Sequence, residues 1–310
     1  MQTTPKKAIV FPGQGAQKTG MAKDFYDDSD EVKQTFAHAS DVLGFDLKSL
    51  CFEQNDRLNL TAYTQPAILT VEIAILRCIK AEYDISFDYY GGHSLGEYTA
   101  LVAAGAMDFS DALKIVHKRG TLMQHAVPEG RGAMIAVIMT NILDEPVAEM
   151  IEETGAEISN YNSTNQIVVS GIKKNVEEAS DRLKETWKKI KVIPLKVSAP
   201  FHSSLMAAIE SPFSEYLSQF KANMEPARAA SVVSNYTGAF HDPDRLLDHL
   251  TKQISGSVQW IRNMKLLAQH ADEIIEVGPN QPLSAFFRTI DIRVQGIVSV
   301  TSMRKHLSAE

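Results

Sequence analysis

The sequence has few cysteines, no excess of basic residues and no long hydrophobic run. Two cysteines in 310 residues, Cys51 and Cys78, exclude a disulfide framework, and no Cys/His cluster has the spacing of a zinc site. The 31 basic residues against 38 acidic ones leave a net charge of −7, which excludes the strongly basic footprint of a nucleic-acid-binding protein. No window reaches the roughly 18 consecutive apolar residues of a membrane span. The first residues lack the apolar core and cleavage site of a secretory signal, so we expect a cytoplasmic protein.

The composition that is present is typical of a globular protein. Hydrophobic residues make up 44% of the chain and charged residues 22%, which excludes a disordered or fibrous protein. The length suits one large domain or two modest ones. Function must therefore be sought in motifs.

Short apolar runs that lead through glycine-rich turns into helical segments predict an α/β fold with a parallel sheet. One run covers residues 8–11, and another precedes Gly92, with a helix expected over 97–104. The apolar spacing also predicts a helix over 67–79, with Pro66 in its first turn. Further elements are expected as helices near 30–43, 203–220 and 261–270 and a strand at 273–277.

The middle of the chain follows a different pattern. Two strand–helix–strand units are predicted, with strands at 132–139, 156–162, 166–170 and 192–197 and helices at 145–154 and 175–190. This order is typical of a small ferredoxin-like α+β module. Because the earlier alternation resumes afterwards, we expect residues 130–198 to form a small subdomain inserted into a large α/β subdomain of residues 1–129 and 199–310.

The sequence Gly92-His93-Ser94-Leu95-Gly96 matches a nucleophile elbow, in which a serine occupies a strained turn between a strand and a helix. An apolar run precedes the motif and a helical segment follows it, as the elbow requires. We therefore expect an α/β-hydrolase-like core around the parallel sheet. The alternative is a glycine-rich turn in which the serine is incidental.

A serine hydroxyl needs an adjacent base, and His202 is the candidate among nine histidines. It follows a strand-like run at 197–201 that ends in a proline-containing loop, and catalytic residues concentrate on loops at strand ends. His93 adjoins the serine but is expected to point elsewhere on the turn. The other histidines fall on predicted helices or polar loops, where a solvated or structural role is expected.

Seven motifs occur in an order that resembles one enzyme family. They are Pro12-Gly-Gln-Gly-Ala-Gln17, Thr64-Gln-Pro-Ala67, Gly92-His-Ser-Leu-Gly-Glu-Tyr98, Arg119-Gly120, Ala199-Pro-Phe-His202, Val258-Gln-Trp260 and Glu276-Val-Gly-Pro279. The set resembles malonyl-CoA:acyl-carrier-protein transacylases, the malonyltransferases of fatty acid and polyketide synthesis. Family members often have Val-Gly-Pro-Gly-Lys where this chain has Val277-Gly-Pro-Asn-Gln-Pro282. Because Asn280 tolerates a left-handed turn, we expect the turn to survive.

The resemblance implies a role for each residue of a catalytic set. Ser94 would be acylated, His202 would be the base, and the backbone carbonyl of Gln253 would orient that histidine. The backbone N–H groups of Gln14 and Leu95 would bind the oxyanion. The candidate substrate-binding residues are Arg119, at the position of the family's carboxylate-binding arginine, together with His93, Phe201 and Asn162.

Three of these substrate contacts have a specific chemical meaning. The guanidinium of Arg119 can hold the free carboxylate of malonate with two parallel hydrogen bonds. Phe201 favours malonyl over the branched methylmalonyl group, and Asn162 is expected to face the pantetheine arm.

The function implied by the resemblance is a ping-pong malonyl transfer that needs no cofactor. Malonyl-CoA acylates Ser94, CoA leaves, and the phosphopantetheine thiol of an acyl carrier protein takes the malonyl group; we expect a monomer. Two alternatives stay open, namely a serine thioesterase or esterase that uses the same elbow and a binding subunit with an inactive site. Arg119 and the Gln14 loop argue against the hydrolase, and the intact set of site residues argues against the binding subunit.

An acidic enzyme that meets an acidic carrier protein needs a local basic surface. Residues 173–191 hold seven basic residues against four acidic ones. One hypothesis is that Lys184, Lys188 and Lys189 steer the carrier protein. The favoured alternative is that they form a solvated helix face.

Overall fold

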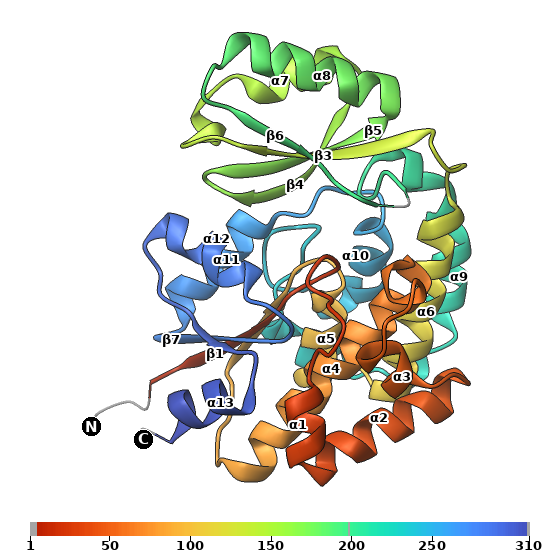
Figure 1. The fold of residues 1–310 in the computed structure, drawn as a ribbon, viewed down its shortest axis with the longest axis vertical. Coiled ribbons are helices and arrows are strands. Elements are labelled where there is room, and N and C mark those ends of the chain that lie inside the picture. Colours follow the sequence, from red (N-terminus) through yellow and green to blue (C-terminus); the bar gives the residue numbers. More distant parts are fainter. Residues whose placement is uncertain (1–4, 198, 309–310) are drawn as a thin grey trace.

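The fold consists of a parallel and an antiparallel sheet, each packed against helices (Figure 1). The computed structural model describes residues 5–197 and 199–308. Residues 1–4, Ser198 and residues 309–310 lie outside the described residues. Ser198 falls in the strand-like run predicted at 197–201, and the described residues of that run do not form a strand. The mixed α/β fold predicted from the sequence is confirmed.

The parallel sheet has the strand order β2-β1-β7-β8, and every neighbouring pair runs parallel. Its strands are β1 (Lys7–Phe11), β2 (Tyr89–Gly92), β7 (Glu273–Val277) and β8 (Gln295–Ile297). Strand β1 is apolar throughout its buried part because both of its faces are covered: Ile9 and Phe11 join one apolar cluster, and Ala8 and Val10 join another.

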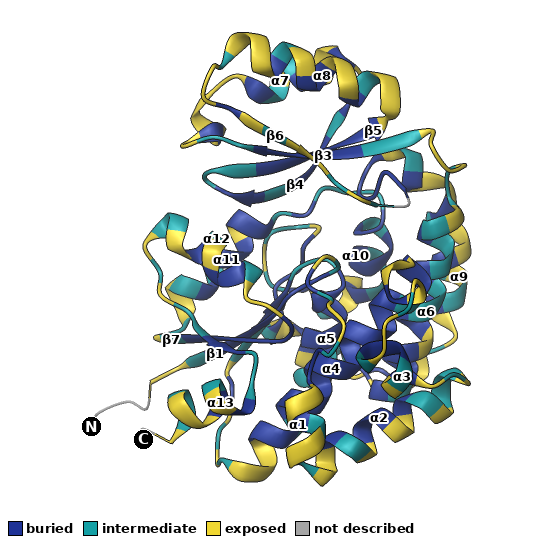
Figure 2. Cartoon of the chain, viewed as in Figure 1, coloured by how far each residue is buried: buried dark blue, intermediate teal, exposed yellow. Residues whose placement is uncertain are grey.

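Helices cover both faces of this sheet. Figure 2 shows that the sides of the helices that face the strands are buried. Helices α4 (Thr61–Glu82) and α6 (Phe109–His125) pack against each other in the larger apolar cluster. The others are α1 (Lys23–Asp28), α2 (Asp30–Leu43), α3 (Leu47–Phe52), α5 (Gly96–Ala103), α9 (Glu210–Ser218), α10 (Leu246–Lys252), α11 (Trp260–His270), α12 (Pro282–Phe287) and α13 (Val300–Leu307).

The antiparallel sheet has the order β4-β5-β3-β6. Its strands are β3 (Gly132–Ile138), β4 (Glu157–Ser163), β5 (Gln166–Ile172) and β6 (Lys191–Pro194), and its helices are α7 (Val147–Glu153) and α8 (Lys173–Thr186). Both helices cover the face that points away from the parallel sheet (Figure 1). On β3, Ile135 and Val137 pack in the cluster under these helices, whereas Met134 and Ala136 line a pocket on the opposite face. The alternation of a strand therefore gives this sheet one structural face and one pocket-lining face.

Backbone hydrogen bonds join the edge strand β4 to Val258, in the segment just before α11. The N–H of Tyr161 donates to the carbonyl of Val258 at 2.9 Å, and the N–H of Val258 donates to the carbonyl of Ser159 at 2.8 Å. This contact satisfies backbone groups that an edge strand would otherwise expose.

The position of Pro66 differs from the prediction. Helix α4 begins at Thr61, so Pro66 lies inside the helix rather than in its first turn. Proline has no N–H to donate to the carbonyl of Ala62, but Nδ1 of His117 donates to that carbonyl at 2.8 Å. By length and composition α4 could cross a membrane, yet 89% of the relevant window is buried inside the fold, as in a core helix.

Two predicted elements have different limits in the structure. The segment predicted as one helix over 203–220 begins as a 3-10 helix, Ser204–Ile209, and becomes α-helical at Glu210, because the ring of Pro212 conflicts with an α-helical turn before it. Strand β6 ends at Pro194 rather than at residue 197, although the N–H of Leu195 still donates to the carbonyl of Met134 on β3 at 2.9 Å. The remaining 3-10 helices are Arg57–Asn59, Ile142–Asp144, Lys221–Asn223, Pro226–Ser231, Pro243–Arg245 and Arg288–Ile290.

Candidate active site

Ser94 lies in a tight turn between β2 and α5, where its backbone has φ +53°. A left-handed conformation costs a non-glycine residue about 1–2 kcal/mol, so the surrounding structure must impose it. The glycines on either side permit close contact with the backbone. A Cβ on Gly92 would lie 2.0 Å from the backbone of Gly96, and one on Gly96 would lie 2.2 Å from the carbonyl oxygen of Phe11. The geometry of a nucleophile elbow is therefore present.

His202 lies beside the serine, with its Nε2 atom 2.8 Å from Ser94 Oγ. Its Nδ1 atom lies 2.8 Å from the backbone carbonyl oxygen of Gln253. Because a carbonyl oxygen only accepts, Nδ1 carries the proton and Nε2 is left to accept the hydroxyl proton of Ser94. His202 is also left-handed, at φ +55°.

The electrostatic surroundings keep His202 neutral. Burial is the main cause, and with the nearby guanidinium of Arg119 it lowers the pKa of His202 to about 3. A neutral imidazole is the form that can accept a proton.

Arg119 extends from α6 to the serine with its side chain almost fully buried. Nη2 donates to Ser94 Oγ at 3.1 Å and to Gln253 Oε1 at 2.8 Å, and Nη1 donates to Gln65 Oε1 at 2.9 Å. All these acceptors are uncharged, and Nε has no partner among the described residues. Burial lowers the pKa of Arg119, while the nearby Tyr98 and Glu97 act in the opposite direction.

These groups open into a pocket of about 320 Å³ between the two sheets. Gln14 and Leu95 lie at its edge, and the carboxamide of Gln14 donates to Thr61 Oγ1 at 3.2 Å. The apolar wall includes Met123, Met134, Ala136, Val168, Leu195 and Phe201. A more open hollow at residues 80–90 contains none of these residues.

The remaining predicted residues form one polar side of the pocket. His93 Nε2 lies 2.8 Å from Asn162 Oδ1, and Asn162 Nδ2 donates to Gln166 Oε1 at 2.8 Å. The His93 ring packs edge-on against Trp260, with centroids 5.7 Å apart. The structure thus brings all nine predicted site residues to the pocket or its immediate support.

The sequence did not single out three polar residues of the site, Gln65, Asn235 and Glu97, or the role of the Gln253 side chain. Gln65 holds Arg119, while Asn235 Oδ1 accepts the Ser94 N–H at 2.7 Å. Glu97 and the Gln253 side chain lie directly beneath the serine. Gln65 belongs to the motif Thr64–Ala67 and Glu97 to the motif Gly92–Tyr98. Nothing in either local pattern indicated which side chain these residues would contact.

The lysines considered for carrier-protein steering lie away from this pocket. Lys184 is exposed on α8, and Lys188 and Lys189 are exposed just after it. Helix α8 covers the face of the antiparallel sheet opposite to the pocket-lining face. This position favours the alternative of a solvated helix face.

A serine with a neutral histidine and a buried arginine, set in a two-sheet α/β fold, defines an acyl-transfer domain, and the acyl transferase domain family matches residues 8–282. The malonyl CoA-acyl carrier protein transacylase of Staphylococcus aureus (strain MRSA252) is 38% identical over 306 residues, which is 96% of this chain and 97% of that protein. The chain belongs to the malonyl CoA-acyl carrier protein transacylase family.

Solved structures agree with this assignment. FabD from Acinetobacter baumannii has a TM-score of 0.91 at 38% identity and covers 99% of this chain and 98% of its own. A malonyl-transacylase in complex with a type II polyketide synthase acyl-carrier protein has a TM-score of 0.88 at 33% identity, covering 98% and 100%.

The low pKa of His202 predicts that the rate of Ser94 acylation changes little as the pH falls below neutral. Because the neutral base persists well below pH 6.5, the single-turnover rate of Ser94 acylation should stay level from pH 8 to about pH 5. Rapid-quench measurement with intact-mass detection reads this rate. The folded fraction must be checked in parallel, since a histidine that protonates only when unfolded makes the free energy of unfolding fall below pH 6.5. A rate that halves near pH 6.5 in folded protein would contradict the assignment of a neutral, desolvated base.

Proposed function

We propose that this protein transfers a malonyl group from malonyl-CoA to the phosphopantetheine thiol of an acyl carrier protein, through a malonyl-Ser94 intermediate. The observation that supports this most strongly is the buried guanidinium of Arg119, which lies 3.1 Å from Ser94 Oγ and whose hydrogen-bond acceptors are uncharged oxygens. A plain acyl group has no use for a buried cation beside the nucleophile. A malonyl group does, because its free carboxylate is one methylene away from the carbonyl carbon that is attacked.

The first half-reaction makes the acyl-enzyme. Ser94 Oγ attacks the thioester carbonyl while His202 Nε2 takes the hydroxyl proton. The carbon–sulfur bond then breaks, and His202 returns the proton to the departing CoA sulfur. The backbone N–H groups of Gln14 and Leu95 are proposed to stabilise the oxyanion of the tetrahedral intermediate.

The second half-reaction reverses these roles. The carrier-protein thiol gives its proton to His202, the sulfur attacks the malonyl ester, and His202 returns the proton to Ser94 Oγ. The carbonyl of Gln253 keeps the imidazole in the required tautomer throughout. A carbonyl stabilises imidazolium less than a carboxylate does, but a thioester needs less assistance because a thiolate leaves easily.

The pocket supports the remaining substrate assignments. We propose that Arg119 binds the malonyl carboxylate. The carboxylate would accept a hydrogen bond from Nε, which has no hydrogen-bond partner among the described residues, or would replace the amide oxygens of Gln65 and Gln253 as acceptor. Phe201 in the apolar wall would disfavour a methyl branch, and His93 and Asn162 would contact the thioester and the pantetheine arm. The hydrolase alternative is less well supported, because the partner of His202 is a carbonyl rather than an acidic side chain.

The finer description of the fold is also a proposal. The strand order β4-β5-β3-β6 with two crossover helices supports a ferredoxin-like subdomain for residues 130–198. The elbow at the end of β2 supports an α/β-hydrolase-like subdomain for residues 1–129 and 199–310. We propose a cytoplasmic monomer without a cofactor, which serves fatty acid or polyketide synthesis.

Intact-protein mass after incubation with malonyl-CoA tests the function. A malonyl adduct should accumulate on the wild-type protein and be discharged by an acyl carrier protein that carries phosphopantetheine. Ser94→Ala should give no adduct, because the attacking oxygen is missing. Turnover of malonyl-CoA to free malonate without an adduct would favour the hydrolase, and an adduct that persists in Ser94→Ala would remove Ser94 from its role.

Arg119→Ala should reverse the substrate preference. Acylation by malonyl-CoA is expected to fall by roughly tenfold to a hundredfold, the worth of charge-assisted hydrogen bonds, while acetyl-CoA becomes relatively favoured. The ratio of the two acylation rates measures this effect independently of the folded fraction. Lys114→Ala is the matched control, because Lys114 is an exposed cation on the same helix. An unchanged ratio in Arg119→Ala would show that the carboxylate binds elsewhere.

A further inference from the structure

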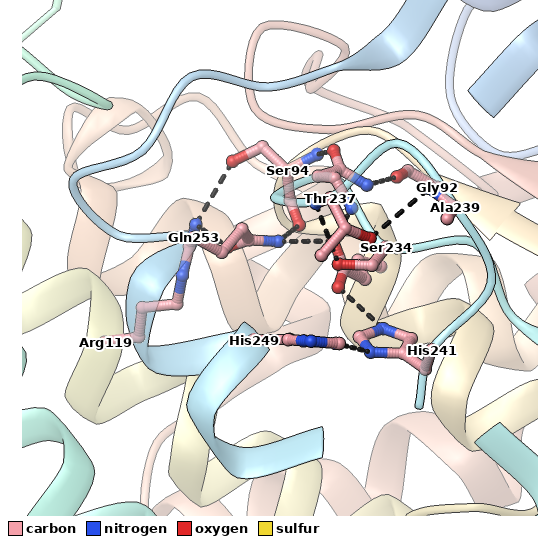
Figure 3. A network of polar contacts seen from close by, with 11 residues as sticks. Gly92, Ser94, Arg119, Ser234, Thr237, Ala239, His241, His249 and Gln253 are labelled. Carbon is pink, nitrogen blue, oxygen red and sulfur yellow. Dashed lines mark hydrogen bonds and ion pairs between the residues drawn. The ribbon is translucent and has the colours of Figure 1, made fainter. Parts of the chain in front are cut away.

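A buried carboxylate, that of Glu97, lies beneath the elbow three residues after the nucleophile. Its side chain is fully buried in the first turn of α5. Oε2 accepts the carboxamide Nε2–H of Gln253 at 2.8 Å and the backbone N–H of Asn235 at 2.8 Å. Figure 3 shows the polar network that continues from Gln253 to Ser94 and Arg119.

Gln253 joins this carboxylate to the reacting groups. Its Nε2 also donates to the Ser94 carbonyl at 2.9 Å, its Oε1 accepts from Arg119 Nη2 at 2.8 Å, and its backbone carbonyl lies 2.8 Å from His202 Nδ1. The carboxamide has one favourable orientation here. If it were turned over, its NH₂ group would face the Arg119 donor and its oxygen would face the Glu97 carboxylate. The acceptor supplied by Glu97 therefore determines which atom of Gln253 meets Arg119.

Two histidines hold the other oxygen of the carboxylate. Glu97 Oε1 and His241 Nε2 lie 2.8 Å apart, an ion-pair separation without the alignment of a hydrogen bond. Nδ1 of His241 lies 3.3 Å from Nδ1 of His249, and the two rings stack with centroids 5.4 Å apart.

One of the two facing Nδ1 atoms must carry a proton and the other must accept it. Burial, together with His241, lowers the pKa of His249 and so favours the neutral form of that imidazole. The other ionisable groups that interact with this cluster are Arg119, Tyr98, Arg245 and Asp248.

We propose that Glu97 is a positioning residue, held by His241 and His249, which sets the malonyl preference of the site by fixing the Gln253 carboxamide against Arg119. The inference rests on the proposed malonyl transfer, because that preference is its readout. Glu97 touches no substrate; it acts through Gln253. What matters is an acceptor at the correct distance, and a negative charge is not itself required.

Substitutions at Glu97 test the proposal through the ratio of malonyl-CoA to acetyl-CoA acylation rates of Ser94. Both rates are measured on one sample, so the folded fraction cancels. Glu97→Leu should lower the ratio by on the order of tenfold, because the Gln253 amide loses its acceptor. Glu97→Gln should keep most of the wild-type preference, since its amide oxygen can face Gln253 and its NH₂ can face His241.

Two further variants keep the test decisive. If Glu97→Leu does not fold, Glu97→Asp serves instead: it retains the charge but withdraws the acceptor, so the ratio should still fall. Glu72→Leu is the matched control, because Glu72 is also fully buried and accepts from Thr99 rather than from Gln253. Its ratio should remain that of the wild type even if stability falls.

The outcomes separate this inference from the proposed function. If the wild-type protein forms no malonyl adduct, the proposed function fails whatever the variants do. If the wild type prefers malonyl-CoA and both Glu97→Leu and Glu97→Asp keep its ratio, the positioning role is wrong. A ratio that falls equally in Glu72→Leu, or equally in Glu97→Gln, also overturns it, because the effect would then follow from general loosening or from lost charge.

Discussion

The active site depends on the hydrogen bonds of one buried residue, Gln253. Its backbone carbonyl fixes the tautomer of His202, its amide oxygen holds Arg119, and its amide NH₂ reaches the carbonyl of Ser94 and the carboxylate of Glu97. The groups that act on the substrate come from separate segments of the chain. Since Gln253 contacts Ser94, His202 and Arg119, one side chain and one peptide group hold these three residues together.

In the free protein, burial is the main influence on the charge states of His202 and Arg119. Removal of water keeps His202 neutral and ready to accept a proton, and the hydrogen bonds of the Arg119 cation go to uncharged amide and hydroxyl oxygens. Both effects suit a substrate that brings its own carboxylate. The left-handed backbones of Ser94 and His202 add a modest conformational cost, which the tight contacts around the elbow impose.

Features with a strong local signal could be predicted from the sequence, and features that depend on distant partners could not. The elbow glycines fix a backbone shape, and Asn280 adopts the expected left-handed turn, at φ +59°. Pro66 was misplaced because the donor that compensates for its missing N–H, His117, belongs to another helix. The hydrogen bonds of Glu97 to Asn235 and Gln253 could not be predicted for the same reason. Both partners lie far from Glu97 in the sequence, and the spacing of residues does not indicate such contacts.

The central claim is that Arg119 receives the carboxylate of the substrate at the acyl-enzyme stage. A crystal structure of the malonyl-Ser94 enzyme, trapped without carrier protein, tests it most directly. The account predicts that the malonyl carboxylate bonds the guanidinium, while the ester carbonyl faces the N–H groups of Gln14 and Leu95. A carboxylate that points to solvent, with Arg119 still bonded to Gln65 and Gln253 as in the free protein, would contradict it.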